Sequence, residues 1–190
     1  ASNRGEASLS ANFYHTNGFN VNSRYQTSGT TVPPSDNYTL QGRMRYRLAK
    51  NTSAGISGRY GLRKSIMTRG YGNDIYKDHM DEADLNAPAY LNSTYTNGLQ
   101  SLSRFYFTHY NWDSKIEWNN GALSEQNNFL QSIFRLEQQF AYNRIADLSL
   151  TGGVGGMLET MNDRSLGNIP SMKNGFVYIQ GEWRLTEQLQ

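Results

Sequence analysis

Residues 38–62 read YTLQGRMRYRLAKNTSAGISGRYGL and alternate between two kinds of side chain. The even positions from Tyr38 to Leu48 are apolar or glycine, whereas the odd positions between them are polar and include three arginines. Successive side chains of a strand point to opposite faces, so this pattern predicts one apolar and one cationic face. Lys50–Thr52 form a polar turn, and the return segment alternates in the same way. The stretch therefore predicts a β-hairpin.

The predicted hairpin has the dimensions of a membrane-spanning one. A transmembrane strand needs about 9–11 residues, more than the usual strand of about 5–6. Tyr38 and Tyr46 lie eight residues apart on the apolar face. That is about 26 Å along a strand, or roughly 20 Å along the bilayer normal at a tilt of ~40°. Two tyrosines at this separation match the two interfaces of a bilayer.

The composition agrees with strands that face lipid on one side and water on the other. Hydrophobic residues make up 37% of the 190 residues and the mean hydropathy is −0.71, which is low for a soluble domain. With 13 Tyr, 8 Phe and 3 Trp the chain is too aromatic for a disordered one. The absence of cysteine excludes disulfides, and a net charge of +2 argues against nucleic acid as a partner. We find no apolar run that predicts a transmembrane helix and no signal peptide.

Alternation along the chain predicts nine strands, which form one unit over residues 1–190. An Asn17-Gly18 turn separates the first two strands, and prolines 33 and 34 mark a loop before the third. Residues 128–143 also fit a helical stripe, but the alternating flanks favour a strand. Residues 67–99 carry no clear pattern and are predicted to be a long loop. The strands are predicted at 8–16, 19–26, 38–49, 52–66, 100–111, 113–119, 128–143, 148–160 and 174–185.

The predicted connections alternate between short and long. The short ones lie near 16–18, 50–52, 111–113, 143–147 and 186–190, and the long ones at 27–37, 67–99, 119–127 and 161–172. This is the layout of an outer-membrane barrel, with tight periplasmic turns and long external loops. The predicted fold is therefore an all-β, antiparallel, up-and-down transmembrane β-barrel segment of about nine long strands in contact with outer-membrane lipid. Because bacterial barrels have an even number of strands, we expect a segment of a larger barrel.

The last residues carry a resemblance to a known family. The phrase VYIQGEWRLTEQLQ resembles a recurrent strand of TonB-dependent outer-membrane receptors, with Tyr178, Gln180 and the run Glu182–Thr186 matching it. Residues 38–61 and 134–156 look like two further hairpins of that barrel. The resemblance implies the plugged 22-stranded class. Such receptors import iron–siderophore complexes, haem, cobalamin or sugars with energy passed from TonB, and colicins and phages exploit many of them.

The same resemblance also marks what this sequence lacks. No plug domain and no TonB box are visible in residues 1–190. The chain is therefore expected to act together with a plug domain and TonB in a full-length protein, with an iron chelate or a similar small molecule as its ligand.

Two groups of side chains are candidates for ligand binding. Arginines on the predicted lumen face attract anions, although such a wall often contacts only water or a plug. Tyrosines of the predicted 67–99 loop suit an external binding surface, although such loops are also often tyrosine-rich without binding. The candidates are Arg43, Arg45, Arg59, Tyr71, Tyr76 and Tyr90.

Metal binding has weaker signals. Carboxylates clustered between residues 74 and 84 suggest a Ca²⁺ site, but their spacing does not match an EF-hand, and a solvated loop is the ordinary interpretation. Three histidines, 15, 79 and 109, suggest haem or metal ligation only by residue type, since no paired spacing links them. The carboxylates are Asp74, Asp78, Asp81, Glu82 and Asp84.

Enzyme activity is not expected, because the sequence has no cysteine, no G-x-S-x-G, no H-E-x-x-H and no Walker loop. Two other functions stay open. One is a small self-contained outer-membrane barrel acting as an adhesin or porin. The other is a soluble β-sheet module that binds a ligand such as a carbohydrate. In that case Leu40, Met44 and Ile56 would be core residues rather than lipid-facing ones.

Overall fold

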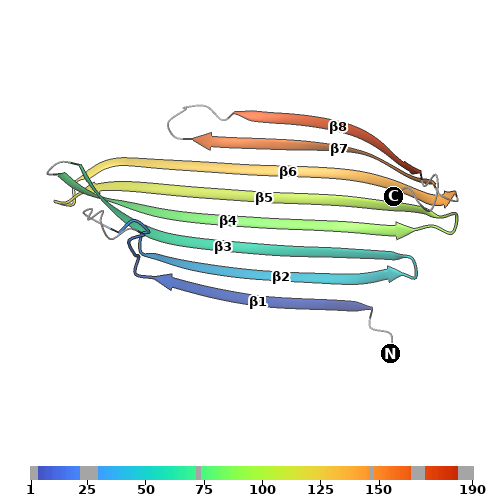
Figure 1. Ribbon diagram of the computed structural model, residues 1–190, viewed down its shortest axis with the longest axis horizontal. Helices are drawn as coiled ribbons and strands as arrows, with labels where there is room; N and C mark the ends of the chain where they lie inside the picture. Colours follow the sequence, from blue (N-terminus) through green and yellow to red (C-terminus); the bar gives the residue numbers. More distant parts are fainter. Residues whose placement is uncertain (1–3, 22–29, 72–73, 146–147, 164–169, 184–190) are drawn as a thin grey trace.

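The chain folds into one antiparallel sheet of eight strands that follow one another in sequence order (Figure 1). The computed structural model describes residues 4–21, 30–71, 74–145, 148–163 and 170–183. Within these residues it contains no helix able to span a membrane. The strands are β1 (Gly5–Thr16), β2 (Ser35–Ala49), β3 (Thr52–Tyr71), β4 (Asp74–Thr94), β5 (Leu99–Trp118), β6 (Leu123–Ile145), β7 (Leu148–Asp163) and β8 (Ser171–Trp183). The predicted all-β, up-and-down class is confirmed.

The strands end more nearly level with one another at one end of the sheet than at the other, where they extend to different distances. Residues 50–51, 95–98 and 146–147 join strands at one end, which we call the turn end. At the opposite end, which we call the extended end, β3–β6 run farthest; these strands have 20 to 23 residues each. That is about twice the length needed to cross a bilayer. The middle hairpins therefore continue well beyond any membrane-spanning portion.

The sheet is a single layer with no apolar core. Among the described residues, no hydrophobic side chain is buried, and the buried polar or charged residues are Ser35, Ser65, Asp78, Ser114 and Glu137. Large apolar side chains such as Leu9, Val177 and Ile179 are 77% to 84% exposed. A water-soluble sheet would bury one apolar face against a second layer. Within the described residues no such layer covers this sheet, so its apolar face is left exposed.

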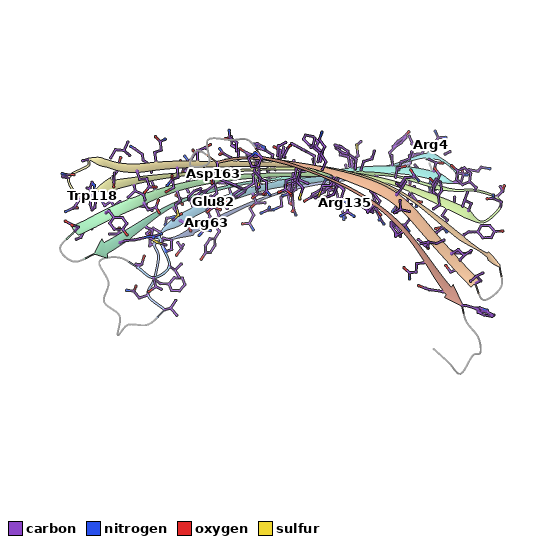
Figure 2. The ribbon with its side chains drawn as sticks, turned by 90° about the horizontal axis from the view of Figure 1, so that it is seen from above. Arg4, Arg63, Glu82, Trp118, Arg135 and Asp163 are labelled. Carbon is purple, nitrogen blue, oxygen red and sulfur yellow. The ribbon has the colours of Figure 1, made fainter. Side chains whose placement is uncertain are left out.

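Apolar and polar side chains segregate onto opposite faces across all eight strands. The register places Ala7, Met44, Ile56, Ala89 and Phe105 opposite one another in one row, and Leu136 continues it on β6. The residues that alternate with them are mainly polar. The sheet is arched, with Arg63, Glu82 and Arg135 on the inside of the arch (Figure 2). We call the apolar outside the convex face and the polar inside the concave face.

The predicted loop 67–99 is wrong, because this stretch contains the end of β3, all of β4 and the first residue of β5. Its outward positions 83, 85, 87, 89 and 91 are all Ala or Leu. Small alanines give a weak hydrophobic signal, and the acidic neighbours hid the alternation. Pro88 strengthened the loop interpretation, since proline cannot donate to a ladder. Here the β3–β4 register skips from Ile56↔Ala89 to Arg59↔Asn86, so the sheet tolerates the proline by a local interruption.

Two further details of the prediction need correction. Residues 100–111 and 113–119 are not separate strands but the single strand β5, so the polar run Asn111–Asp113 is not a turn. The described part of 19–26 contributes only an isolated bridge between Phe19 and Val32, while residues 22–26 lie outside the described part of the chain. The strand count is therefore eight rather than nine.

The strict alternation of short and long connections is wrong as well. Residues 72–73 and 119–122 are short links at the extended end, where long loops were predicted. Strand extension, rather than irregular loop, occupies the sequence there. The predicted turns at 50–52 and 143–147 lie at the turn end as expected, and 128–143 belongs to the strand β6.

Glycines on the concave face receive aromatic rings from the neighbouring strand. A Cβ added to Gly155 would overlap the ring of Phe176 and approach the Leu136 carbonyl oxygen to 2.9 Å. A Cβ on Gly153 would meet the Tyr178 ring at 2.7 Å. Each ring therefore lies over a glycine directly opposite it in the register. This arrangement fixes Phe176 and Tyr178 flat against the wall.

We predict that Gly155→Ala destabilises the sheet by about 1–3 kcal/mol, because the new methyl group overlaps both a ring and a backbone oxygen. The midpoint of urea unfolding in detergent micelles measures the change. Gly58→Ala is the matched control, since no heavy atom lies within 4 Å of the position of its Cβ. Equal midpoints for the two variants would contradict the ring-over-glycine packing.

Candidate functional site

The concave face contains a groove of about 1160 Å³ that crosses the middle of the sheet. It lies among side chains from β1 to β6, so no single hairpin forms it. Its lining combines guanidinium groups, carboxylates and tyrosine rings, which is the chemistry of a site for a polar or charged ligand. The concave-face residues that line it include Glu6, Ser8, Arg43, Arg45, Ser57, Tyr90, Arg104, Tyr106, Arg135 and Glu137.

Glu137 is the centre of the hydrogen-bond network beside this groove. Its side chain is 9% exposed, and its two oxygens accept from Arg104 Nη1 at 3.2 Å and Arg135 Nη2 at 3.0 Å. The Tyr178 hydroxyl donates a third hydrogen bond at 3.0 Å. Arg135 also stands over the Phe176 ring, 5.1 Å from its centroid. Glu137 therefore holds two arginines and a tyrosine of three strands in fixed positions.

Other charges on the concave face are paired in the same way. Arg59 Nη1 lies 2.5 Å from Asp84 Oδ2, and Arg63 contacts Glu82 at 3.7 Å. Arg69 contacts Asp78 at 3.6 Å. These pairs link β3 to β4 towards the extended end. They neutralise each other, so this part of the wall presents little net charge to a ligand.

Arg43 and Arg45 differ from the other arginines of the groove. Both are exposed, and no carboxylate of the described chain lies within ion-pair distance of either. Arg43 Nε donates to Ser8 Oγ at 3.1 Å, which orients its guanidinium towards β1. Unpaired guanidinium groups in a concave wall attract anions. The excess positive charge of the groove therefore lies on β2.

The predicted tyrosines separate into three places. Tyr90 lines the groove with its ring over Gly55, across the β3–β4 ladder. Tyr76 lies at the far extended end, edge-to-face with Trp118 at 6.0 Å, and does not line the groove. Tyr71 is the last residue of β3, and its side chain is outside the described part of the structure. Of the six predicted ligand residues, the groove unites Arg43, Arg45 and Tyr90, and Arg59 lies in a smaller groove next to it.

The carboxylates proposed for Ca²⁺ lie on a strand, β4, rather than on a loop. Asp81 points to the convex face and the other four to the concave face, as alternation requires. Asp78, Glu82 and Asp84 each contact an arginine. No three acidic or histidine side chains within the described ranges form a group that could hold a metal. The Ca²⁺ site stays a prediction, without support from this arrangement.

All three histidines lie on the convex face, because each shares its parity with apolar outward residues. His15 Nδ1 is 2.7 Å from Asp36, and His109 bonds Ser132 at 2.9 Å. His79 lies 3.5 Å from Glu117 near the extended tip. A hydrogen bond from Lys115, followed by the Lys115 charge, lowers the pKa of Glu117 below its usual value. The histidines are therefore not directed at a ligand in the groove.

Sequence reasoning missed the residues that organise the groove, namely Glu137, Arg104, Arg135 and Tyr178. Their alternation with Phe105, Phe134 and Leu136 was visible and indicated their face. The sequence did not indicate that residues 104, 137 and 178 would meet, because the register of the four strands β5–β8 decides it. Arg104 was the signal, since one arginine among aromatic residues points away from lipid.

The apolar band of the convex face runs diagonally across the strands. One row of register partners begins at Ala11 on β1 and crosses all eight strands. On β2–β4 this row carries the apolar residues Leu40, Tyr60 and Leu85. On β5–β8 it carries the polar residues His109, Ser132, Thr160 and Ser171. The outer boundary of the band lies between Phe13 and His15 on β1, and between Lys173 and Val177 on β8. Between β1 and β8, the outer boundary of the band therefore moves by about seven residues towards the turn end, relative to that row.

This shift measures the tilt of the strands against the band. Seven residues at ~3.3 Å each are about 23 Å, and seven strand spacings of ~4.8 Å are about 34 Å. The corresponding tilt is roughly 35°, at the lower end of the ~35–45° of transmembrane barrels. The tilt comes from the side-chain pattern and the register alone.

Comparison with solved structures shows which fold this is. The chain is similar to the ferric citrate transporter FecA in its unliganded form, with 8% identity and a TM-score of 0.64 over 95% of this chain. It is similar to BauA, the ferric preacinetobactin receptor of Acinetobacter baumannii, with 11% identity and a TM-score of 0.59 over 98%. It is also similar to the ferric yersiniabactin uptake receptor FyuA of Yersinia pestis, with 10% identity and a TM-score of 0.52 over 96% of this chain.

These structures are outer-membrane β-barrels, and the sheet described here has the fold of part of such a wall. The chain spans about a third of their length, namely 32%, 36% and 32%. No protein-family model matches the sequence, and no curated protein matches it. The likeness is therefore one of fold.

We predict that Glu137→Gln destabilises the protein by about 1.5–3 kcal/mol, because hydrogen bonds to a charged acceptor are replaced by weaker ones. Urea unfolding in micelles measures the loss. Glu6→Gln removes an exposed carboxylate from the same face and should leave stability within about 0.5 kcal/mol. A Glu137 variant as stable as the Glu6 variant would contradict the central position of Glu137.

Proposed function

We propose that the chain is part of the barrel wall of a TonB-dependent receptor in the bacterial outer membrane. The receptor takes up an iron–siderophore complex, haem or a similar scarce ligand. A plug domain and TonB are its partners in the full-length protein, and colicins are expected to exploit such a receptor. The chain acts as a wall and a binding surface, not as an enzyme.

One observation carries this proposal: the convex face is apolar across eight strands while no apolar side chain of the described chain is buried. Exposure of this extent is costly in water, at about 25 cal/mol for each Å² of apolar surface. Lipid removes that cost. The diagonal band and the roughly 35° tilt add support, since both follow from strands that cross a bilayer obliquely. The similar structures include two ferric-chelate receptors and a ferric citrate transporter.

The concave groove is the ligand-facing part of the wall. Arg43 and Arg45 supply unpaired positive charge, while the Glu137 network fixes the opposite side. A negatively charged chelate gains most from such a surface. We therefore propose that Arg43, Arg45 and Tyr90 contact the ligand or line its path, with Arg59 beside them.

The two rival functions fit the geometry less well. A small self-contained barrel needs β1 to pair with β8, and no contact between these strands occurs among the described residues. A soluble binding module needs a second layer over the apolar face, and the described chain forms one sheet. Both features favour a wall that continues beyond this sheet.

We predict that Met44→Arg impairs membrane insertion of the protein by about 2–4 kcal/mol, because it places a charge on the lipid face near mid-bilayer. Met44 is 54% exposed and lies between Tyr38 and Leu48 on the convex side of β2. Partitioning into the outer membrane and the heat-modifiable shift on a gel report insertion.

The matched control is Thr39→Arg, which puts the same side chain on the concave face of the same strand. It should insert like the unaltered protein. Normal insertion of Met44→Arg, or equal failure of both variants, would overturn the assignment of the convex face to lipid.

We predict that R43Q/R45Q in the full-length protein binds ferric citrate, an anionic chelate, roughly tenfold more weakly. Each screened charge contributes about 0.5–1 kcal/mol, and 1.4 kcal/mol is a tenfold change. Binding to the unaltered protein should also weaken as salt rises. Equilibrium binding at two salt concentrations measures both effects.

A neutral ferric trihydroxamate complex and the variant Lys50→Gln serve as controls. Lys50 lies in the β2–β3 turn, away from the groove. Equal losses for neutral and anionic chelates, or for K50Q and R43Q/R45Q, would contradict an electrostatic site on β2.

A further inference from the structure

Three hydrogen-bonded polar side chains interrupt the apolar band of the convex face. They are Ser101 and Ser103 on β5 and Gln138 on β6, and we call them the polar trio. Ser103 Oγ donates to Gln138 Oε1 at 2.5 Å, and Gln138 Nε2 donates to Ser101 Oγ at 2.9 Å. The register partner of Gln138 on β7 is Val154, which is 52% exposed. The trio therefore faces outwards, away from the groove.

Gln138 lies in the middle of the apolar band on β6. The outward residues of this strand, from the outer boundary towards the turn end, are Phe134, Leu136, Gln138, Phe140 and Tyr142. The strand from the first to the last of these residues is about 26 Å long, or roughly 21 Å along the bilayer normal at a tilt of ~35°. Gln138 is the midpoint, so its amide is about 10 Å from either edge of the band.

The surroundings of the trio are apolar except on one side. Ser103 is opposite Leu91 on β4, and the nearest outward neighbours of Gln138 along β6 are apolar. On the remaining side Ser101 is opposite Ser93, whose hydroxyl lies 3.2 Å from that of Thr52 at the turn end. The polar surface thus begins at the inner boundary of the band, and Gln138 is its deepest member.

The trio does not use all of its own hydrogen-bonding groups. Both amide protons of Gln138 are used, because Nε2 also donates to the Gln139 carbonyl at 3.1 Å. The hydroxyl proton of Ser101 has no acceptor among the described residues, and Gln138 Oε1 accepts one of the two hydrogen bonds that it can take. Lipid tails offer neither donors nor acceptors, so such groups are costly in hydrocarbon. One donor and one acceptor are therefore left facing outwards.

An apolar groove of about 570 Å³ opens on the convex face beside Gln138. Gly156 on β7 has no side chain to fill it, which allows another surface to approach closely. The outward side chains that line the groove include Phe105, Phe134, Leu136, Val154 and Leu158. A partner seated on the trio would also pack into this groove.

We propose that the polar trio is the centre of a contact between two copies of this protein in the membrane. A two-fold axis along the bilayer normal keeps both copies in the same orientation. Across this axis, the Ser101 hydroxyl of each copy donates to Gln138 Oε1 of the other. An unused donor beside an unused acceptor is complementary to itself, which favours a second copy over an unrelated partner. This inference rests on the proposed function, because it needs the convex face to be in a bilayer.

The test uses the full-length protein, labelled with a donor or an acceptor fluorophore, in phosphatidylcholine vesicles. Energy transfer at decreasing protein-to-lipid ratios measures the fraction of paired molecules. We expect Q138L to pair at least fivefold more weakly, since leucine keeps an apolar surface but removes the acceptor. S101A removes the donor and should weaken pairing similarly. T160L is the matched control, because it replaces an outward polar residue of β7 outside the trio.

A mixture of the two variants tests the reciprocal hydrogen bonds. S101A keeps the acceptor and Q138L keeps the donor, so a mixed pair retains one of the two bonds, whereas neither variant retains one with itself. We therefore expect more energy transfer between S101A and Q138L than within either variant alone. Loss of a purely structural side chain would not produce this excess.

The outcomes separate this inference from the proposed function. Equal pairing by Q138L and the unaltered protein, equal loss with T160L, or no excess in the mixture would overturn the inference alone. An unaltered protein that stays monomeric at every protein-to-lipid ratio would also overturn it, in favour of another partner for the trio. Failure of the unaltered protein to enter the vesicles would instead overturn the proposed function.

Discussion

The structure depends on a single layer of backbone that separates two environments. The inner strands β2–β7 pair on both sides, so their backbone hydrogen bonds lie within the ladder and both faces are left to the side chains. One face is apolar and exposed, and the other carries the charges. In water this arrangement would leave the apolar face uncovered. In a bilayer the same face is the stable one, and the ladder is what permits a polar backbone to cross hydrocarbon.

On the concave face, packing and charge pairing replace a hydrophobic core. The rings of Phe176, Tyr178 and Tyr90 lie over glycines of the neighbouring strand, so the missing side chains of these glycines leave room for the rings. Glu137 then connects Arg104, Arg135 and Tyr178 across three strands. The charges around Glu137 are thus paired, whereas Arg43 and Arg45 on β2 have no carboxylate partner among the described residues.

The charge pairs of the concave face are made by arginines. Guanidinium groups are multidentate donors, which suits carboxylate networks such as that of Glu137. The oblique course of the apolar band shows that its boundary does not follow the strand register. Both faces therefore fit the same tilted placement.

The sequence by itself determined the strand class and the faces. Strict alternation in 38–62 and 148–160, and the choice of a strand for 128–143, needed no partner, because alternation is a property of one extended chain. Sequence reasoning failed for 67–99, where alanines carry the outward face and Pro88 lies inside a strand, because hydropathy cannot detect small outward residues or a locally interrupted ladder. Only the tertiary structure decided the convergence of Glu137 with Arg104 and Tyr178, the separation of Tyr76 from the groove, the dispersal of the carboxylates of β4 and the diagonal band. Each depends on the register between neighbouring strands, and a shift of two residues preserves every face while changing every neighbour.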